Sequence, residues 1–447
     1  MSYRQALGAF AAGLSFERLA PEVQQHARWI LADTIGAIAG GSVEPELRAL
    51  ADSQSASGAA TPIGFARHAG ADSAAFLNGT GGTFLEMDEG NRFARGHPAI
   101  HAVPAALAIA ETMGADADTF LAAVVVGYEV GARLAAASRL RASMHTHGTW
   151  GTIGAAAAAA RAAGRGEGAM RNVLNIAASL TTATSKLTML QGGLVRNVYA
   201  GLANRNGILA LELHAAGFGG EADGLHTLFT SIVSDAFDPG QAIDGLGSQW
   251  QLMRNYFKLH ACCRFNHGTL DALDVLAERG ELPEPQDVEA VVVETYGMAA
   301  EMDNAVPANT LGAKFSIPFA VATRLHHGHS RLEAFTWEAV RDAGVLALAQ
   351  KVTVREDAAM SARLPDERPA RVSVRRTDGR TVAAEVAFNR GDDAAPYGLE
   401  ELAGKFLQLT GRVWPGPHCE ALLEATLALG NAGTSFERWR GLLRRPA

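Results

Sequence analysis

Apolar runs rich in alanine and glycine fill the first half of this 447-residue chain, and they restrict its fold more than any other feature. One of them, Gly148–Gly164, contains the uninterrupted alanine stretch Ala155–Ala160. Alanine has the highest helix propensity, and small side chains let helix backbones approach one another closely. The run therefore predicts the centre of a tight helix bundle, although helix propensity alone would also account for it.

Helical periodicity extends along most of the first half. Pro21 suits the first turn of a helix that ends at Gly40-Gly41, and its apolar positions follow the 3.6-residue period. Further helices are predicted over Ala71–Leu85, Ala102–Met113, Asp118–Ser138, Gly151–Ala163, Ala169–Thr182, Ala203–Ala216 and Leu225–Ser234.

The pattern changes after about residue 275, where a proline-containing linker, Glu281–Pro285, precedes short β-branched segments. These segments predict strands, two of which form a hairpin around Asp378-Gly379. A second, α+β domain is therefore expected, followed by a return to helices. The predicted strands are Val288–Thr295, Lys351–Arg355, Arg371–Arg376 and Arg380–Phe388, and the predicted helices are Ala313–His326, Trp337–Ala349, Leu399–Leu409 and Glu420–Leu429.

Composition argues against several classes of function. The formal net charge is −8 with both signs scattered, so neither a nucleic acid nor a membrane surface is an expected partner. No signal segment and no long unbroken apolar run is apparent, which makes the cytoplasm the expected compartment. No phosphate-binding glycine loop or metal-type cysteine spacing is present, so no cofactor, metal or disulfide is predicted, and the cysteines Cys262, Cys263 and Cys419 are expected in the core.

Four polar clusters interrupt the apolar segments. All are rich in arginine, lysine or histidine, and each adjoins a predicted helix, where loss of water shifts pKa values as acid/base chemistry requires. Together they predict a cationic pocket for a small polyanion. The clusters are Glu86–His101, Met144–Thr152, Gln191–Gly201 and Lys258–His267.

Each cluster also has a simpler interpretation. A charged loop between helices is often only solvated, and Arg196 could lie in solvent on a surface turn. The pair His145 and His147 could be half of a metal site that assists hydrolysis, although no further ligand stands at an obvious spacing.

The chain resembles the MmgE/PrpD family, also called the 2-methylcitrate dehydratase superfamily, along nearly its whole length. The family includes 2-methylcitrate dehydratase, cis-aconitate decarboxylase and iminodisuccinate epimerase, all of which rearrange bonds beside a carboxylate without a cofactor. The motifs that carry the resemblance are Asn78-Gly79-Thr80, Gly96-His97-Pro98, Val103–Ala108, Gly127–Val130, Gly151–Ala155 and Lys258–Phe265.

The resemblance implies a mainly α fold. A large helical domain over residues 1–270, completed by residues 395–447, would carry a smaller α+β lid domain over residues 271–394. It also implies a homodimer.

The resemblance further implies the site residues. Asp88 matches the family's active-site aspartate, His97 its loop histidine and His145 the histidine ahead of the Gly-Thr helix. We predict that His145 is the base, that Asp88 orients a histidine and that His97 delivers a proton. The other predicted groups are Lys258 in catalysis and Arg196, Arg264, His101 and Tyr199 in substrate binding, while Glu86, Glu89 and Arg92 are left as solvated or structural charges.

Two positions depart from the dehydratase and decarboxylase patterns. Arg196 stands in place of a lysine, and Phe319 in place of a tyrosine. Arginine does not give up its proton at working pH, so it binds carboxylates but hardly serves as an acid or base. The departures indicate a changed reaction or substrate and weaken the decarboxylase interpretation most.

The resulting expectation is an enzyme that removes a proton α to a carboxylate of a small di- or tricarboxylate. Elimination of water would make it a 2-methylcitrate dehydratase-like hydro-lyase, and reprotonation on the opposite face would make it an epimerase of the iminodisuccinate type. The acidic loop and the segment Val195–Gly201 are more similar to the epimerase branch. A decarboxylase and a non-catalytic carboxylate-binding protein are the remaining alternatives.

Overall fold

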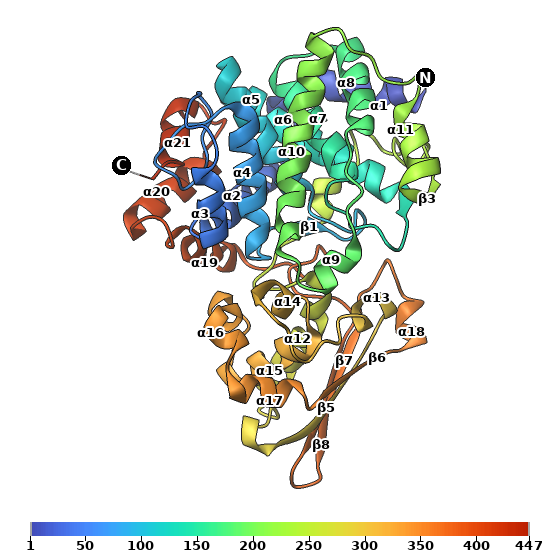
Figure 1. The fold of residues 1–447 in the computed structure, drawn as a ribbon, viewed down its shortest axis with the longest axis vertical. Coiled ribbons are helices and arrows are strands. Elements are labelled where there is room, and N and C mark those ends of the chain that lie inside the picture. The colour runs from blue at the N-terminus through green and yellow to red at the C-terminus, as the bar shows by residue number, and fades with distance from the viewer. Residues whose placement is uncertain (1, 446–447) are drawn as a thin grey trace.

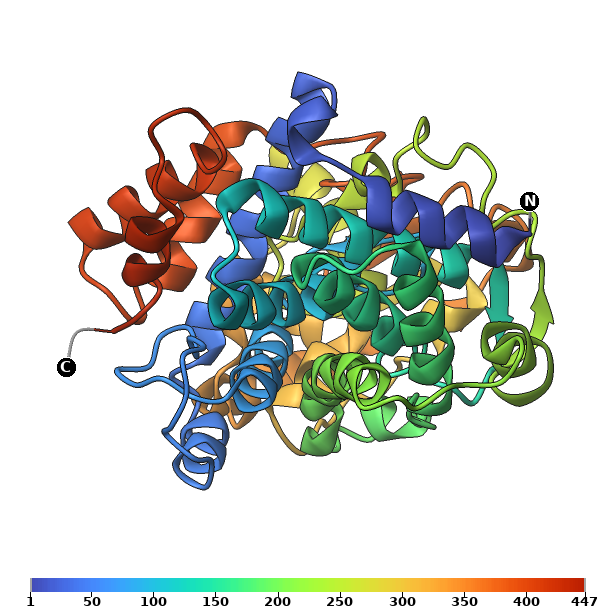
Figure 2. The same cartoon turned by 90° about the horizontal axis from the view of Figure 1, so that it is seen from above.

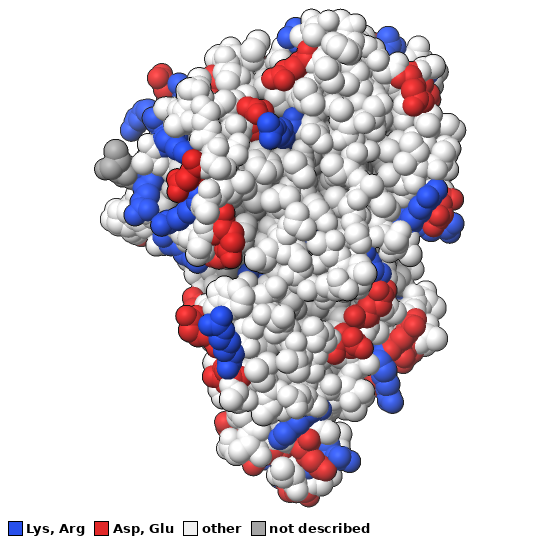
Figure 3. Space-filling model, in the orientation of Figure 1, with Lys and Arg blue, Asp and Glu red and all other residues white. Residues whose placement is uncertain are grey.

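The computed structural model describes residues 2–445. A large helical body is drawn in blue and green with red helices at one side, and a smaller part in yellow and orange carries the main sheet (Figure 1). The fold is mainly α with a small α+β region, as predicted from the sequence. Lys, Arg, Asp and Glu of both signs are dispersed over the face seen in Figure 3, whose centre carries few charges.

Tightly packed helices of small residues form the centre of the helical body. Helices α6 (Ala117–Ala136) and α7 (Trp150–Ala162) lie against each other, and the Ala155–Ala160 stretch is fully buried. A Cβ placed on Gly127 would lie 2.8 Å from the backbone oxygen of Gly154, so the two helices meet backbone to backbone. Around them pack α4 (Ala71–Phe84), α5 (Pro98–Met113), α8 (Glu167–Ser179) and α10 (Val198–Ala215).

Both ends of the chain build this body. Helix α2 (Pro21–Gly41) packs on α19 (Leu399–Thr410) and α20 (Gly416–Leu427), so residues from the two ends share one hydrophobic core. Figure 2 shows the red C-terminal helices beside the blue N-terminal ones. The remaining helices at the two ends are α1 (Tyr3–Gly13), α3 (Pro45–Asp52) and α21 (Phe436–Leu442).

The smaller part contains a four-stranded sheet in the order β6-β5-β7-β8. Strands β5 and β6 are parallel, whereas β5–β7 and β7–β8 are antiparallel, and the β7–β8 hairpin turns at Gly379 with φ +87°. Helices α12 and α15 pack beside the sheet around a second hydrophobic core. The bounds are β5 Val288–Thr295, β6 Val352–Glu356, β7 Ala370–Arg376, β8 Thr381–Val386, α12 Arg264–Glu278 and α15 Ile317–His327.

Two predicted helices are each divided in the structure. The Ala313–His326 segment separates into α14 (Thr310–Lys314) and α15, because Ser316 caps a new helix that has Pro318 in its first turn. The Trp337–Ala349 segment separates into α16 (Trp337–Val340) and α17 (Ala343–Ala349), since the Asp342 side chain accepts hydrogen bonds from the amides of Gly344 and Val345. The domain borders at 271 and 394 stay a prediction.

Helix α6 is long and apolar enough to cross a membrane by length and composition, but 89% of its apolar window is buried inside the protein. It is a core helix of the body. The three cysteines are buried free thiols.

Candidate active site

The loop between α4 and α5, residues 85–97, carries most of the candidate site. Its short strand β1 (Gly90–Asn91) pairs with β4 (Asn255–Tyr256), and the Asn91 side chain accepts hydrogen bonds from the amides of Phe93 and Ala94. Glu86 and Arg95 have φ values of +56° and +54°, and they are the only non-glycine residues with positive φ in residues 2–445. Such strained conformations tend to occur at functional sites.

The two ends of the chain hold this loop in place. Asp33 on α2 accepts a hydrogen bond from the Glu89 amide at 2.8 Å. Lys405 on α19 donates to Asp33 and to the carbonyl oxygen of Met87, each at 2.5 Å. A buried charge pair from two distant segments therefore fixes the backbone next to Asp88.

Asp88 and His97 form a pair at the centre of the loop. The Asp88 carboxylate lies 3.0 Å from His97 Nδ1, which also lies 2.7 Å from the carbonyl oxygen of Glu89. Because a carbonyl only accepts, Nδ1 must carry a proton, and in the neutral ring Nε2 then holds the lone pair. Burial alone would raise the pKa of Asp88, but His97 and Lys258 outweigh burial and lower it, so the carboxylate stays ionised.

Glu86 is buried beside Asp88, so of the two alternatives predicted for it, a solvated or a structural charge, the solvated one is wrong. Its carboxylate lies 2.5 Å from Arg196 Nη1 and 3.4 Å from Lys258 Nζ. Burial would raise the pKa of Glu86, yet these two cations outweigh burial and lower it. Two carboxylates thus neutralise Arg196 and Lys258, and the cluster is a closed ionic network rather than a group of free cations.

Four histidines surround the network. The His147 ring packs edge-on against His97, His101 and His145 at centroid distances of 5.0, 4.9 and 4.9 Å. Its own ring nitrogens have no hydrogen-bond partner among residues 2–445. Burial is the main cause that lowers the pKa values of His145, His147 and His101, the last to about 4, so these rings are neutral.

The two hydrogen bonds of His145 compete for the single lone pair of its neutral ring. The backbone amide of His147 donates to Nδ1 at 3.0 Å, and Arg196 Nε donates to Nε2 at 3.4 Å. The shorter bond favours the tautomer that carries its proton on Nε2. In that tautomer Nε2–H and Arg196 Nε–H are neighbouring donors, an arrangement that suits an oxygen on which negative charge develops.

A cavity of about 250 Å³ opens onto these groups. His97, His145, His147 and Arg196 line one end together with Glu86. Apolar side chains form much of the remaining wall, and they include Leu140, Met144, Met189, Leu190, Phe265 and Phe315.

Several predicted site residues lie behind or beside this wall. Lys258 is fully buried under the two carboxylates and donates to the Glu86 carbonyl at 2.9 Å. His101 is also fully buried and bonds the His97 carbonyl, while Tyr199 packs its ring against His145. Arg264 reaches the cavity, but Asp392 at 2.8 Å holds its guanidinium. For these four residues, direct contact with a substrate stays a prediction.

Phe319 does not belong to the cavity lining. Its ring is fully buried in the core of the smaller part, 5.9 Å from the ring of Phe335. The missing hydroxyl at this position therefore gives no reason to reject any of the three reactions. Phe315 is the residue of this segment that lines the cavity, and the Arg196 guanidinium lies over its ring at 5.2 Å.

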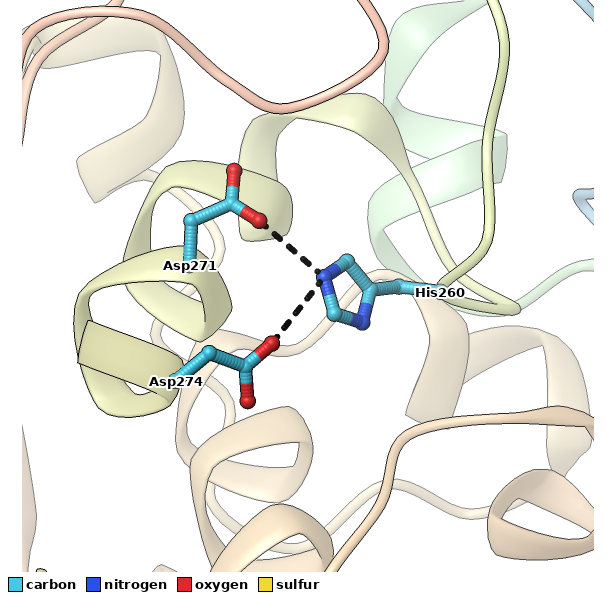
Figure 4. A group of neighbouring side chains, drawn as sticks. All are labelled: His260, Asp271 and Asp274. Atoms are coloured by element: carbon cyan, nitrogen blue, oxygen red, sulfur yellow. Dashed lines mark hydrogen bonds and ion pairs between the residues drawn. The ribbon is translucent and has the colours of Figure 1, made fainter. Parts of the chain in front are cut away.

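A second polar cluster consists of His260, Asp271 and Asp274 (Figure 4). These residues line another cavity, of about 220 Å³. His260 Nε2 faces Asp271 and Asp274 of α12 at 3.3 and 4.0 Å, a spacing that could hold a metal ion. One oxygen of the Asp271 carboxylate accepts a hydrogen bond from the Arg390 amide, and one oxygen of the Asp274 carboxylate accepts from Arg324 Nε. The cluster links α12 to the Ser330 loop, because His260 Nδ1 also contacts the Ser330 hydroxyl at 2.5 Å.

Comparison with known proteins agrees with this architecture. The model of the MmgE/PrpD N-terminal domain matches residues 5–236, and that of the C-terminal domain matches residues 260–429. The chain belongs to the MmgE/PrpD family. The helical body and the loop of residues 85–97 are therefore parts of an MmgE/PrpD protein, as the sequence motifs indicated.

Curated relatives of this MmgE/PrpD chain are fungal. It is 27% identical to the cis-aconitate decarboxylase-like protein oryM of Aspergillus oryzae, over 91% of this chain and 90% of that protein. It is 25% identical to a cis-aconitate decarboxylase of Aspergillus terreus, over 60% of this chain and 59% of that protein.

Sequence reasoning missed four cavity-lining groups: Glu86, His147, Arg95 and Arg368. Glu86 and His147 are each two residues from a predicted site residue, Asp88 and His145 respectively. This closeness in sequence is the signal from which both could have been predicted. Arg368 precedes β7 in the smaller part, and no local pattern marks it.

Proposed function

We propose that this MmgE/PrpD-family protein is a cofactor-independent hydro-lyase that removes a proton α to a carboxylate of a small di- or tricarboxylate and then eliminates water. The observation that supports this most is the pair of cavity-lining imidazoles, His97 and His145. In the neutral rings, the Glu89 carbonyl favours a lone pair on His97 Nε2, and the His147 amide favours a proton on His145 Nε2. A base beside a hydrogen-bond donor for the developing charge suits an elimination.

In this proposal His97 is the base, the role first predicted for His145. His97 Nε2 takes the proton from the α carbon, and Asp88 stabilises the imidazolium that forms. The electron pair moves onto the substrate carboxylate, whose oxygens accept hydrogen bonds from Arg196 and His145. The His97 imidazolium then passes this proton to the leaving hydroxyl, while His145 Nε2–H keeps its hydrogen bond to the substrate carboxylate. The C–O bond breaks, and an alkene and water result, with both imidazoles neutral again.

The relatives favour a second candidate, decarboxylation. Both named relatives carry cis-aconitate decarboxylase in their names, and the burial of Phe319 away from the cavity removes one objection to that reaction. The same donors, Arg196 and His145, would stabilise the carbanion left by loss of carbon dioxide. An epimerase would share the first proton abstraction and differ only in reprotonation.

A substrate panel tests the proposal. The purified protein is incubated with citrate, 2-methylcitrate, iminodisuccinate and cis-aconitate, and the products are followed by proton NMR and by mass spectrometry of released carbon dioxide. Alkene formation from a hydroxy acid is the expected result. Carbon dioxide from cis-aconitate without any dehydration would replace the hydro-lyase by the decarboxylase, and inversion of a stereocentre alone would replace it by the epimerase.

A further inference from the structure

Six cations line the main cavity, and they differ in whether a carboxylate neutralises them. Four have a carboxylate within 4.0 Å: Arg196 pairs with Glu86, Lys186 with Glu301, Arg264 with Asp392 and Arg141 with Asp235. Among residues 2–445, no carboxylate lies within that distance of Arg95 or Arg368. The cavity therefore holds two positive charges that the protein itself leaves uncompensated.

Arg368 is the more informative of the two because it is buried. Only 6% of the residue is exposed, and its guanidinium lies over the Phe265 ring at 5.6 Å. Its side chain donates one hydrogen bond, from Nη2 to the carbonyl oxygen of Arg92 at 3.1 Å. A guanidinium has five N–H donors, and burial of its charge is costly without an anion nearby.

Arg95 is placed next to this charge by a strained backbone. It adopts φ +54° at the turn that Asn91 and Gly96 close with an isolated bridge. Desolvation and then the charge of Arg368 lower the pKa of Arg95, although the Arg95 side chain is exposed to solvent. The strained backbone thus adds an exposed cation to the cavity lining that also contains the buried Arg368, where an anion could contact both.

The other residues that line the cavity with Arg95 and Arg368 indicate the shape of that anion. Arg196, His97 and His145 come from the helical body, whereas Arg368 comes from the smaller part and donates to the Arg92 carbonyl oxygen, in the loop that also carries His97. Phe265, Met189 and other apolar side chains line the same cavity. A ligand with two separated carboxylates and a hydrocarbon skeleton matches this lining.

We propose that Arg368, assisted by Arg95, binds a carboxylate of the substrate remote from the carbon that loses its proton. The inference rests on the proposed function for the polycarboxylate class of the ligand. It assigns to the smaller part of the protein the selection of dicarboxylates and tricarboxylates over monocarboxylates. Arg368 is a binding residue in this account, and its loss affects KM rather than kcat.

Calorimetric binding of a non-reactive probe tests the proposal without any turnover. The probes are tricarballylate, which has three carboxylates, and butyrate, which has one. The variant R368Q is compared with R141Q, which removes a charge from the same cavity but one that already has a carboxylate partner. Because hydrogen bonds to charged groups contribute more than neutral ones, R368Q should weaken tricarballylate binding about tenfold to a hundredfold, and R141Q less than about threefold.

Two further variants keep the test decisive. R368K retains the charge in the buried position and should recover part of the affinity, and R95Q alters a side chain at the cavity mouth and should weaken binding about three- to tenfold. Equal tricarballylate affinity in the wild type, R368Q and R95Q would overturn the inference, and so would a wild type that binds butyrate as tightly as tricarballylate. Arg368-dependent binding with no turnover would contradict only the proposed function, whereas normal turnover with an unchanged KM in R368Q would contradict only this inference.

Discussion

At the residue scale, hydrogen bonds to the backbone favour one imidazole as a proton acceptor and the other as a hydrogen-bond donor. The Glu89 carbonyl requires a proton on His97 Nδ1, and the His147 amide requires a lone pair on His145 Nδ1. Both constraints come from atoms that cannot change their protonation. In the neutral rings these two contacts favour a lone pair on His97 Nε2 and a proton on His145 Nε2, before any substrate binds.

Asp88→Asn tests the carboxylate that supports His97. The amide cannot stabilise an imidazolium, so kcat should fall about 10²- to 10⁴-fold, the range that general base catalysis contributes. Steady-state kinetics on the substrate found by the panel measures this effect. Asp72→Asn is the matched control, because Asp72 pairs with Arg205 on the surface and should leave kcat unchanged. An Asp88→Asn enzyme with wild-type kcat would remove Asp88 from the mechanism.

Glu89→Gln tests a buried carboxyl group through the pH dependence of stability. Burial raises the pKa of Glu89 to about 8, above the value of about 4.3 for glutamate in an unfolded chain. The stability that the bound proton contributes is complete below about pH 4.3 and is lost as the pH rises through about 8. Urea unfolding at pH 5 and pH 8 should show a larger loss for the wild type than for Glu89→Gln, by a few kcal/mol. Parallel losses in both proteins would contradict the burial of an ionisable Glu89.

At the element scale, small residues determine how close the central helices lie. A Cβ on Gly127 would stand 2.7 Å from the Ala158 Cβ and 2.8 Å from the Gly154 backbone oxygen. Backbone atoms cannot rotate away, so the α6–α7 contact tolerates no added methyl group. The loop of Asp88 and the segment of His145 adjoin the helices of this bundle, and the contact therefore bears on the geometry of the site.

Gly127→Ala should destabilise the protein by about 1 to 3 kcal/mol through overpacking. Gly404→Ala in the middle of α19 is the matched control, because a Cβ there meets nothing within 4 Å. It should be neutral or stabilising by up to about 1 kcal/mol, the helix propensity difference between the two residues. Urea unfolding measures both, and equal effects of the two substitutions would contradict the close packing of α6 on α7.

The helices and strands were largely predictable because their signals are local. Periodicity, Pro21, and the Asp378-Gly379 turn each act within a few residues, so the strands of the sheet were placed within a few residues of their observed ends. The division of the Ala313–His326 helix was missed because a serine cap followed by proline inside an apolar run interrupts the helix without changing its apolar pattern.

The site was predictable only in part. Asp88, His97 and His145 could be named because they stand at positions that match motifs of the MmgE/PrpD family. The burial of Glu86 could not, because the cations that compensate its charge, Arg196 and Lys258, are distant in sequence. The proton positions depend on backbone amides and carbonyls, which no residue pattern reveals.

At the scale of the whole molecule, the two chain ends meet beneath the candidate site. Lys405 of the C-terminal helix α19 and Asp33 of the N-terminal helix α2 are a buried pair, and Lys405 also holds the carbonyl next to Asp88. The smaller part contributes Phe315, Phe265 and Arg368 to the same cavity, and the Phe315 ring lies against Arg196. Three distant regions of the chain therefore assemble one cavity, and the homodimer implied by the family resemblance stays a prediction.

Lys405→Met tests this connection between the ends. Removing the ammonium leaves Asp33 as a buried unpaired carboxylate, which should lower the free energy of unfolding by about 3 to 5 kcal/mol. The double variant Asp33→Asn with Lys405→Met should regain part of that loss. Lys186→Met is the control, because its partly exposed pair with Glu301 should contribute less than about 1 kcal/mol. Similar losses for Lys405→Met and Lys186→Met in urea unfolding would contradict the role of the buried pair.

Proton abstraction by His97 is the central claim, and solvent exchange measures it most directly. The substrate is incubated with enzyme in deuterated water, and deuterium at the α carbon of recovered substrate is measured by mass spectrometry. We predict incorporation with the wild type and none with His97→Gln. With His145→Gln, which changes a hydrogen-bond donor but keeps the base, exchange should be slower than in the wild type and still measurable. Wild-type exchange by His97→Gln would show that another group removes the proton and would contradict the account.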